Sequence, residues 1–311
     1  MPLDEPTAAL LEQIRAVWGK PLHEMTPKEA RALTAARPDA SPPEMAEVRD
    51  VRVRVSGGSV PVRVLTPPGP LRGVIVYYHG GGWVLGGLAE SDPVGRRLAQ
   101  RSQCVVVMPD YRLAPEYRFP VAVDDAWAAL GWAAEHVTEL AAGPAPLIVA
   151  GDSAGGNLAA VMTQRARSRG GPAIAVQVLA YPVTDCDFDN LSYLDEANQL
   201  MLSRDAMIWF WDHYAPDRRA RAHVDASPLR SGVFAGLPPA VVLTAEYDVL
   251  RDEGELYATQ LVKNRVPVFH QRFAGQMHGF FTMVDVLPGA SAALDFIAEG
   301  VEKHLAAGRP V

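Results

Sequence analysis

One short motif places a serine where it can act as a nucleophile. Residues 151–155 read Gly-Asp-Ser-Ala-Gly, which matches the pattern G-x-S-x-G. An apolar stretch over residues 147–150 predicts a strand before the motif, and residues 157–168 predict a helix after it. A sharp strand-to-helix turn holds its serine in an unusual backbone conformation, which small neighbouring glycines permit. We therefore predict Ser153 as a nucleophile; the alternative is a glycine-rich loop that only turns the chain.

A nucleophilic serine needs a base and a carboxylate that orients the base. In α/β sheets that carry this motif, both groups follow later strands, in the chain order serine, acid, histidine. Asp248 follows a predicted strand over residues 240–244, and His278 follows one over residues 268–273. We expect His278 to be the base and Asp248 its partner.

Rival residues for these two roles fit less well. Glu246 and Asp252 are alternatives to Asp248, although Asp252 also suits the first turn of the helix predicted after it. The other histidines precede the serine, precede the acid, or lie inside predicted helices and strands. We therefore take Asp248 as the acid, with Glu246 and Asp252 as the alternatives.

A second glycine-rich segment follows the predicted strand over residues 74–78. Residues 79–83 read His-Gly-Gly-Gly-Trp, and three consecutive glycines leave backbone N–H groups uncovered. Such groups stabilise an oxyanion that develops during acyl transfer. A phosphate-binding loop is the alternative, but no G-K-[ST] follows and the spacing is not G-x-G-x-x-G.

The elements around these motifs alternate between short apolar strands and longer helices from about residue 70 onward. Strands that are apolar throughout belong to a parallel sheet covered on both faces, so we predict one α/β core over residues 48–184 and 226–311. Residues 1–47 and 185–225 break the alternation and are expected to form a helical cap. Residues 48–65 predict an antiparallel hairpin at the edge of the sheet.

Composition excludes several classes of protein. The chain has 311 residues, 49% of them hydrophobic, and a formal net charge of −7, so it should fold and should not bind nucleic acid. We read no signal peptide and no apolar run of membrane-spanning length, and we expect no integral membrane association. The two cysteines fit a reduced compartment and show no metal-ligand spacing. We expect a cytoplasmic protein without metal or organic cofactor and leave a homodimer open.

The motifs together resemble the bacterial hormone-sensitive-lipase-like esterases, the family IV carboxylesterases. The resemblance covers nearly the whole chain. The segments that carry it are His79-Gly-Gly-Gly-Trp83, Asp110-Tyr-Arg-Leu-Ala-Pro-Glu116, Gly151-Asp-Ser-Ala-Gly-Gly-Asn157, Tyr181-Pro182, Asp248-Val-Leu-Arg-Asp252 and His278-Gly-Phe280.

This resemblance implies an α/β-hydrolase fold with a helical cap and the triad Ser153, Asp248 and His278. It also implies that the backbone N–H groups of Gly81, Gly82 and Ala154 form the oxyanion hole. Residues 110–116 would be a structural turn, with Arg112 and Glu116 in an internal ion-pair network. One departure from the family is Gln276, whose role stays open.

Large apolar residues in the second cap segment suggest a substrate pocket. Because such residues at helical spacing pack more often into a core, core packing is an equal alternative. The candidates for substrate binding are Trp83, Met207, Trp209, Phe210, Trp211 and Tyr214.

These features predict a serine carboxylesterase that acts on a small-molecule ester of short or medium chain length through an acyl-enzyme. A non-catalytic small-molecule receptor on the same fold is one alternative, and an amidase or peptidase with the same triad is another. Epoxide hydrolases and dehalogenases are disfavoured, because they have an aspartate at the position of Ser153.

Overall fold

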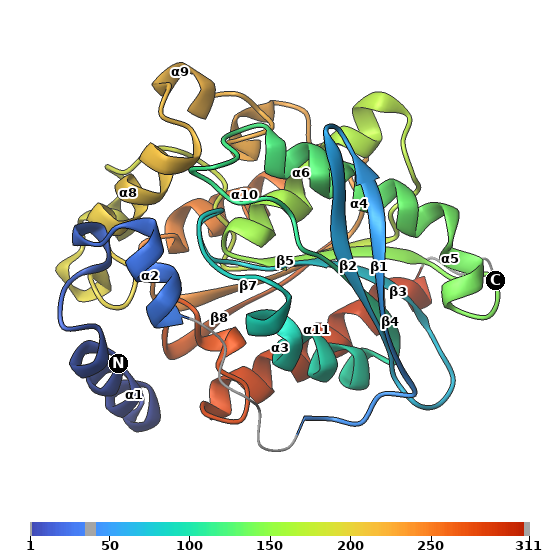
Figure 1. The fold of residues 1–311 in the computed structure, drawn as a ribbon, viewed down its shortest axis with the longest axis horizontal. Helices are drawn as coiled ribbons and strands as arrows, with labels where there is room; N and C mark the ends of the chain where they lie inside the picture. Colours follow the sequence, from blue (N-terminus) through green and yellow to red (C-terminus); the bar gives the residue numbers. More distant parts are fainter. Residues whose placement is uncertain (1, 35–41, 308–311) are drawn as a thin grey trace.

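The computed structural model describes residues 2–34 and 42–307 and is built around one sheet (Figure 1). The strand order is β1-β2-β4-β3-β5-β6-β7-β8. β2 pairs antiparallel with β1 and with β4, whereas every pair from β4 to β8 is parallel. The strands are β1 Glu47–Val55, β2 Gly58–Thr66, β3 Gly73–Tyr78, β4 Cys104–Pro109, β5 Leu147–Asp152, β6 Val176–Ala180, β7 Ala240–Tyr247 and β8 Val268–Met277.

Helices cover both faces of this sheet (Figure 1). Alternate side chains of β3 point to opposite faces, so Val76 joins a core beneath α4, α6 and α10, whereas Ile75 joins one beneath α3 and α11. The covering helices are α3 Leu88–Ser102, α4 Val121–Glu135, α6 Ala154–Arg169, α10 Arg251–Lys263 and α11 Pro288–Ala307, with the short α5 Val137–Leu140 after α4. Burial on both sides explains the uninterrupted apolar strands and confirms the predicted fold class.

Element boundaries differ from the sequence expectations where a motif lies. The helix after the serine begins at Ala154, three residues before the predicted start at residue 157. β8 continues to Met277, beyond the predicted end at residue 273, because its last residues still pair with β7 past a bulge. Both differences move regular structure closer to the predicted catalytic residues.

Two helical segments outside the sheet, which we call the cap segments, lie side by side (Figure 1). The first holds α1 Glu5–Trp18, η1 Leu22–Glu24 and α2 Pro27–Thr34. The second, over residues 185–225, holds α7 Leu191–Leu194, η2 Glu196–Asn198, α8 Arg204–Tyr214 and α9 Arg218–Arg221; η3 Pro228–Ser231 follows it, and η4 Phe280–Thr282 precedes α11. The indole Nε1 of Trp209 donates to the carbonyl oxygen of Met25 at 3.1 Å and joins the two segments. Residues 35–41 of the predicted cap lie outside the described residues.

Candidate active site

The turn between β5 and α6 holds Ser153 in a strained conformation. Its φ and ψ angles are 54° and −119°, a region that side chains with a Cβ rarely occupy. The glycines on either side are required by space: a Cβ on Gly155 would overlap the carbonyl oxygen of Tyr78, and one on Gly151 would overlap that of Gly155. The turn therefore brings helix α6 against strand β3 and places the serine hydroxyl at the end of the sheet.

The predicted triad residues meet at the ends of three strands. The Nε2 atom of His278 lies 3.0 Å from the Oγ atom of Ser153, and its Nδ1 atom lies 2.8 Å from Oδ2 of Asp248. Because an ionised carboxylate only accepts hydrogen bonds, Nδ1 carries the proton and Nε2 presents its lone pair to the serine hydroxyl. The backbone N–H of Leu250 donates to Oδ1 of Asp248 at 2.9 Å and fixes the carboxylate. All three side chains are buried.

The rival carboxylates have other partners. Oε2 of Glu246 accepts a hydrogen bond from the backbone N–H of Gly275 at 2.7 Å. Oδ2 of Asp252 accepts one from the backbone N–H of Ser192 at 2.8 Å, and so ties α7 to the start of α10. Of the three candidate acids, Asp248 is the one that the structure places against His278.

The glycine loop after β3 is fixed beside the serine by a buried carboxylate. Oδ1 of Asp152 accepts hydrogen bonds from the Tyr77 hydroxyl at 2.6 Å and from the backbone N–H of Gly80 at 2.9 Å. Burial raises the pKa of Asp152, and these two hydrogen bonds act against the increase. Gly81 and Gly82 have φ angles of 105° and 59°, so the loop adopts a conformation that glycine favours.

The segment that follows β4 also fixes this loop, through contacts with His79. The imidazole of His79 stacks on the ring of Tyr111, with 4.3 Å between the ring centroids, and the Tyr111 hydroxyl donates to the carbonyl oxygen of His79 at 2.7 Å. Arg112 makes an ion pair with the fully buried Asp125, at 2.6 Å between Nη2 and Oδ1. The segment contains a turn at residues 114–116, as the family resemblance implied.

The expected network of Arg112 and Glu116 is wrong in one respect. Glu116 belongs to a separate pair with Arg31 of α2, at 2.8 Å, and its side chain is 54% exposed. The same guanidinium donates to the carbonyl oxygens of Val84 and Ala114. Arg31 therefore ties the first cap segment to the core, and Glu116 lies at the surface where this contact is made.

A cavity of about 270 Å³ opens beside the serine, and we call it the catalytic cavity. Met207 and Phe210, two of the six predicted pocket residues, line it from one face of α8. Leu22 and Thr34 contribute from the first cap segment. The full lining is Trp18, Leu22, Thr34, Tyr77, His79, Gly80, Gly81, Gly82, Leu85, Gly86, Gly87, Glu90, Ser91, Val94, Asp152, Ser153, Met201, Leu202, Met207, Phe210, His278, Gly279 and Thr282.

The other four predicted pocket residues are absent from this lining. Trp83 stacks on Tyr214 with ring centroids 4.1 Å apart and meets Trp211 edge-on at 5.0 Å, and all three are fully buried. Trp209 points to the other cap segment, where it donates to Met25. Their placement favours the core alternative, because three of the rings pack against one another and the fourth is bonded to the first cap segment.

Sequence reasoning missed the contribution of the first cap segment. Trp18 and Leu22 line the catalytic cavity although they precede Ser153 by more than 130 residues. No local signal marks them, since apolar residues on an amphipathic helix look alike wherever the helix docks.

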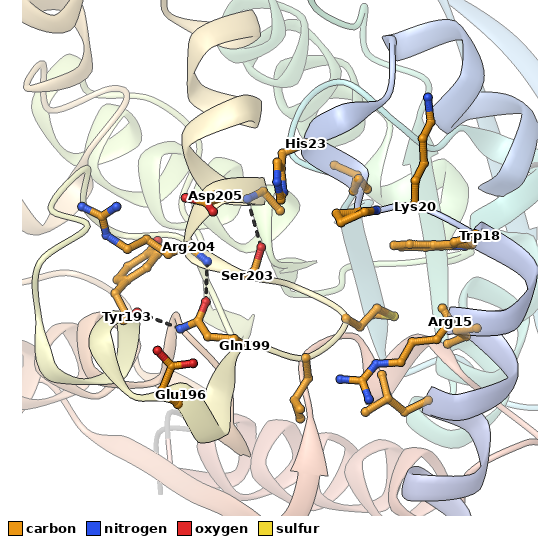
Figure 2. Close-up of a pocket in the computed structure, with 18 of the residues that line it drawn as sticks. Arg15, Trp18, Lys20, His23, Tyr193, Glu196, Gln199, Ser203, Arg204 and Asp205 are labelled. Carbon is orange, nitrogen blue, oxygen red and sulfur yellow. Dashed lines mark hydrogen bonds between the residues drawn. The ribbon is translucent and has the colours of Figure 1, made fainter.

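A second cavity, which we call the outer cavity, lies between α1–η1 and residues 193–206 (Figure 2). Its volume is about 640 Å³. Three residues, Trp18, Leu22 and Met201, also line the catalytic cavity, so the two spaces share a wall. The further lining residues are Leu11, Ile14, Arg15, Gly19, Lys20, Pro21, His23, Tyr193, Leu194, Glu196, Gln199, Leu200, Ser203, Arg204, Asp205 and Ala206.

Two other properties concern the described residues. No group of three or more histidine, cysteine, aspartate or glutamate side chains among them is arranged to hold a metal ion. None of the helices formed by residues 2–34 and 42–307 is both long and apolar enough to cross a membrane.

Residues 75–282 match a family model described as alpha/beta hydrolase fold. The chain belongs to this family. It is 42% identical over 262 residues to a carboxylesterase of Mycobacterium tuberculosis, with 81% of this chain and 82% of the relative covered. It is 34% identical to an ethyl acetate hydrolase of Pseudomonas putida, with 98% and 100% covered. The predicted resemblance to family IV carboxylesterases is confirmed.

Solved structures agree with the family assignment. A hyperthermophilic esterase from Pyrobaculum calidifontis superposes with a TM-score of 0.89 at 37% identity, with 98% of this chain and 99% of that chain covered. A thermophilic carboxylesterase cloned from a metagenomic library superposes with a TM-score of 0.84 at 40% identity, with 92% and 99% covered.

Proposed function

We propose that this α/β hydrolase is a serine carboxylesterase that cleaves carboxylic esters of short to medium chain length. The observation that carries the proposal is the unbroken hydrogen-bonded series from Asp248 through His278 to Ser153 at the base of a cavity. The names of its relatives, which include a carboxylesterase and an ethyl acetate hydrolase, support the same reaction class.

Acylation begins when His278 Nε2 takes the proton of the Ser153 hydroxyl as Oγ attacks the ester carbonyl carbon. The imidazolium that forms is stabilised by the carboxylate of Asp248, which is held by the Leu250 N–H. When the tetrahedral intermediate collapses, the C–O bond to the alcohol breaks and His278 gives its proton to the leaving oxygen.

Deacylation repeats the sequence with water. His278 removes a proton from the water as it attacks the acyl-enzyme carbonyl, and then returns the proton to Ser153 Oγ when the acid leaves. In both half-reactions the negative oxygen would be held by the backbone N–H groups of Gly81, Gly82 and Ala154. The position of Gly81 and Gly82 in the cavity lining and the start of α6 at Ala154 support this assignment.

Hydrolysis of p-nitrophenyl esters from acetate to palmitate tests the proposal, with Ser153→Ala purified in parallel. We expect the highest kcat/KM at short or medium chains and a loss of up to about 10⁶-fold in kcat in the variant. An arylamide series run beside it separates an esterase from an amidase. Absence of ester turnover by folded wild-type protein would favour the receptor or amidase alternative.

Three further proposals concern the domain organisation, the location and the oligomeric state of the protein. We propose that residues 1–47 and 185–225 act as one cap on a core of residues 48–184 and 226–311, and that the protein is cytoplasmic. A homodimer is a further proposal, for which β1 and β8 each offer one edge without a neighbouring strand among the described residues. Sedimentation of the purified protein distinguishes a dimer from a monomer.

A further inference from the structure

The catalytic cavity is small for a medium-chain ester. Its volume of about 270 Å³ lies below the range of about 300–1,000 Å³ that is usual for small-molecule pockets. A longer substrate bound with its carbonyl carbon at Ser153 must continue beyond this space. Trp18, Leu22 and Met201 line both cavities, so the outer cavity is directly adjacent.

The outer cavity has an aliphatic patch within a lining that also carries charged and polar side chains, and its arginines and lysine have ion-pair partners. Leu11, Ile14, Leu194 and Leu200 contribute aliphatic surface. The ion pairs of its rim are Arg15 with Glu12, Lys20 with Glu29, and Arg204 with Asp189. These pairs neutralise the positive charge, and Glu196 and Asp205 add carboxylates to the lining. The aliphatic patch therefore suits an uncharged alkyl chain, whereas the charges around it do not favour a free anion.

We propose that the outer cavity is a distal subsite for the alkyl chain of an ester whose carbonyl carbon lies at Ser153. The proposal rests on the proposed esterase function. The chain can belong to the acyl group or to the alcohol, since the lining recognises only its apolar surface.

A tryptophan placed in the outer cavity tests this subsite. Ile14 lines the outer cavity and not the catalytic cavity, so Ile14→Trp fills the former alone. The matched control is Val17→Trp on the same helix, because Val17 is exposed and lines neither cavity. The substrates are p-nitrophenyl acetate and dodecanoate for the acyl arm, and ethyl and decyl acetate for the alcohol arm.

We expect Ile14→Trp to lower the ratio of kcat/KM for the long ester to that for the short one by about tenfold in one arm. The arm affected identifies which half of the ester the subsite holds. Val17→Trp should leave both ratios within about twofold of wild type. Unchanged ratios in both arms of Ile14→Trp, with acetate still hydrolysed, would overturn the subsite and leave the esterase proposal intact. Failure of wild type to hydrolyse any ester would instead remove the esterase proposal itself.

A separate observation concerns Gln276, which precedes His278 by two residues and is 3% exposed. Its Nε2 donates to Oδ2 of Asp4, and its Oε1 accepts from the Thr7 hydroxyl at 3.3 Å. Oδ1 of the same aspartate caps α1 by accepting from the Thr7 N–H at 2.8 Å. The amide of Gln276 is also tightly enclosed, because a Cβ on Gly289 would overlap it.

Gln276 therefore joins the first turn of α1 to the end of β8, and the last turn of α1 carries Trp18. We infer that Gln276 is a positioning residue that holds α1 as the wall of both cavities. It acts on substrate binding through α1 rather than on the reacting atoms, and this inference too rests on the proposed esterase function.

Exchanging the donor and the acceptor tests this role. Gln276→Glu puts a carboxylate against that of Asp4, and Asp4→Asn then supplies an amide donor while keeping an oxygen that can cap α1. We expect Gln276→Glu to raise KM for p-nitrophenyl dodecanoate by about tenfold, with a smaller change in kcat. The double variant should return KM to within about threefold of wild type.

Two results would overturn the role of Gln276. One is an unchanged KM in Gln276→Glu. The other is a double variant in which KM rises by the product of the factors measured for Gln276→Glu and Asp4→Asn alone. Two substitutions that act independently give that outcome. Urea unfolding of each variant separates a change in KM from a change in the folded fraction.

Discussion

The serine turn and the cap segments are held in place in different ways. The serine turn lies between a central strand and a buried helix, and two glycines let its neighbours pack against each other's backbone. The cap segments contact the core through buried apolar side chains, such as Trp211 against Trp83. Side-chain hydrogen bonds, such as those of Trp209, Arg31 and Gln276, join them to each other and to the core surface. Geometry for bond breaking is thus fixed by the sheet, and the shape of the cavities is set by elements attached to it.

The largest effect outside the nucleophile is expected for the acid of the triad. The side chain introduced by Asp248→Asn would have the shape of the aspartate but would favour the tautomer of His278 in which Nε2 carries the proton. Nε2 then has no lone pair with which to accept the proton of Ser153. We expect kcat to fall by about 10⁴-fold with an unchanged folded structure. Steady-state kinetics and circular dichroism check this; activity within tenfold of wild type would indicate that another carboxylate orients the histidine.

The next largest effect is expected in the glycine loop. A Cβ on Gly82 would overlap the ring of Phe210, and the φ angle of 59° is unfavourable for alanine. Gly82→Ala should therefore displace the loop and lower kcat by about 10²-fold or more. Gly131→Ala is the control, because nothing lies within 4 Å of a Cβ at that position and its φ is not positive. Equal activity of the two variants would argue against a loop that stabilises the oxyanion.

A third prediction separates the cavity-lining residues of α8 from its core residues. Trp211→Ala removes a fully buried side chain and should lower the free energy of unfolding by about 3–5 kcal/mol. Phe210→Ala should instead shift the preferred ester chain length, since its ring lines the catalytic cavity. Urea unfolding and the p-nitrophenyl ester series measure the two effects. A larger shift in the preferred chain length for Trp211→Ala than for Phe210→Ala would indicate that Trp211 contacts the substrate.

The smallest effect is expected where the first cap segment meets the core surface. The pair with Arg31 lowers the pKa of Glu116 from 4.5 to about 2. Glu116 thus contributes stability that is fully present above pH 4.5 and lost as pH falls toward 2. Because its side chain is more than half exposed, screening limits the contribution to less than about 1 kcal/mol. Urea unfolding of wild type and Glu116→Gln should show a difference in the free energy of unfolding that is smaller at pH 3 than at pH 7. The same difference at both pH values would exclude the ion pair as its cause.

The sheet and the order of its motifs were accessible from sequence, because parallel strands covered on both faces must be apolar and their loops must meet at one edge. That rule places Ser153, Asp248 and His278 together without knowledge of distant contacts. The cavities were not accessible in the same way. Trp18 reaches the site only because α1 docks beside β8, and Glu116 pairs with Arg31, which lies 85 residues away in the chain. Docking of this kind depends on individual hydrogen bonds that no periodic pattern records.

The position of Asp4 bears on how the protein should be produced for study. The N–H of Asp4 donates to the carbonyl oxygen of Gly275 at 3.1 Å, only three residues before His278. A bulky group attached close to Asp4 would compete for the space that α1 needs, because Asp4 packs directly against Gly275. Substrate profiles recorded with and without such a group would therefore describe different positions of α1.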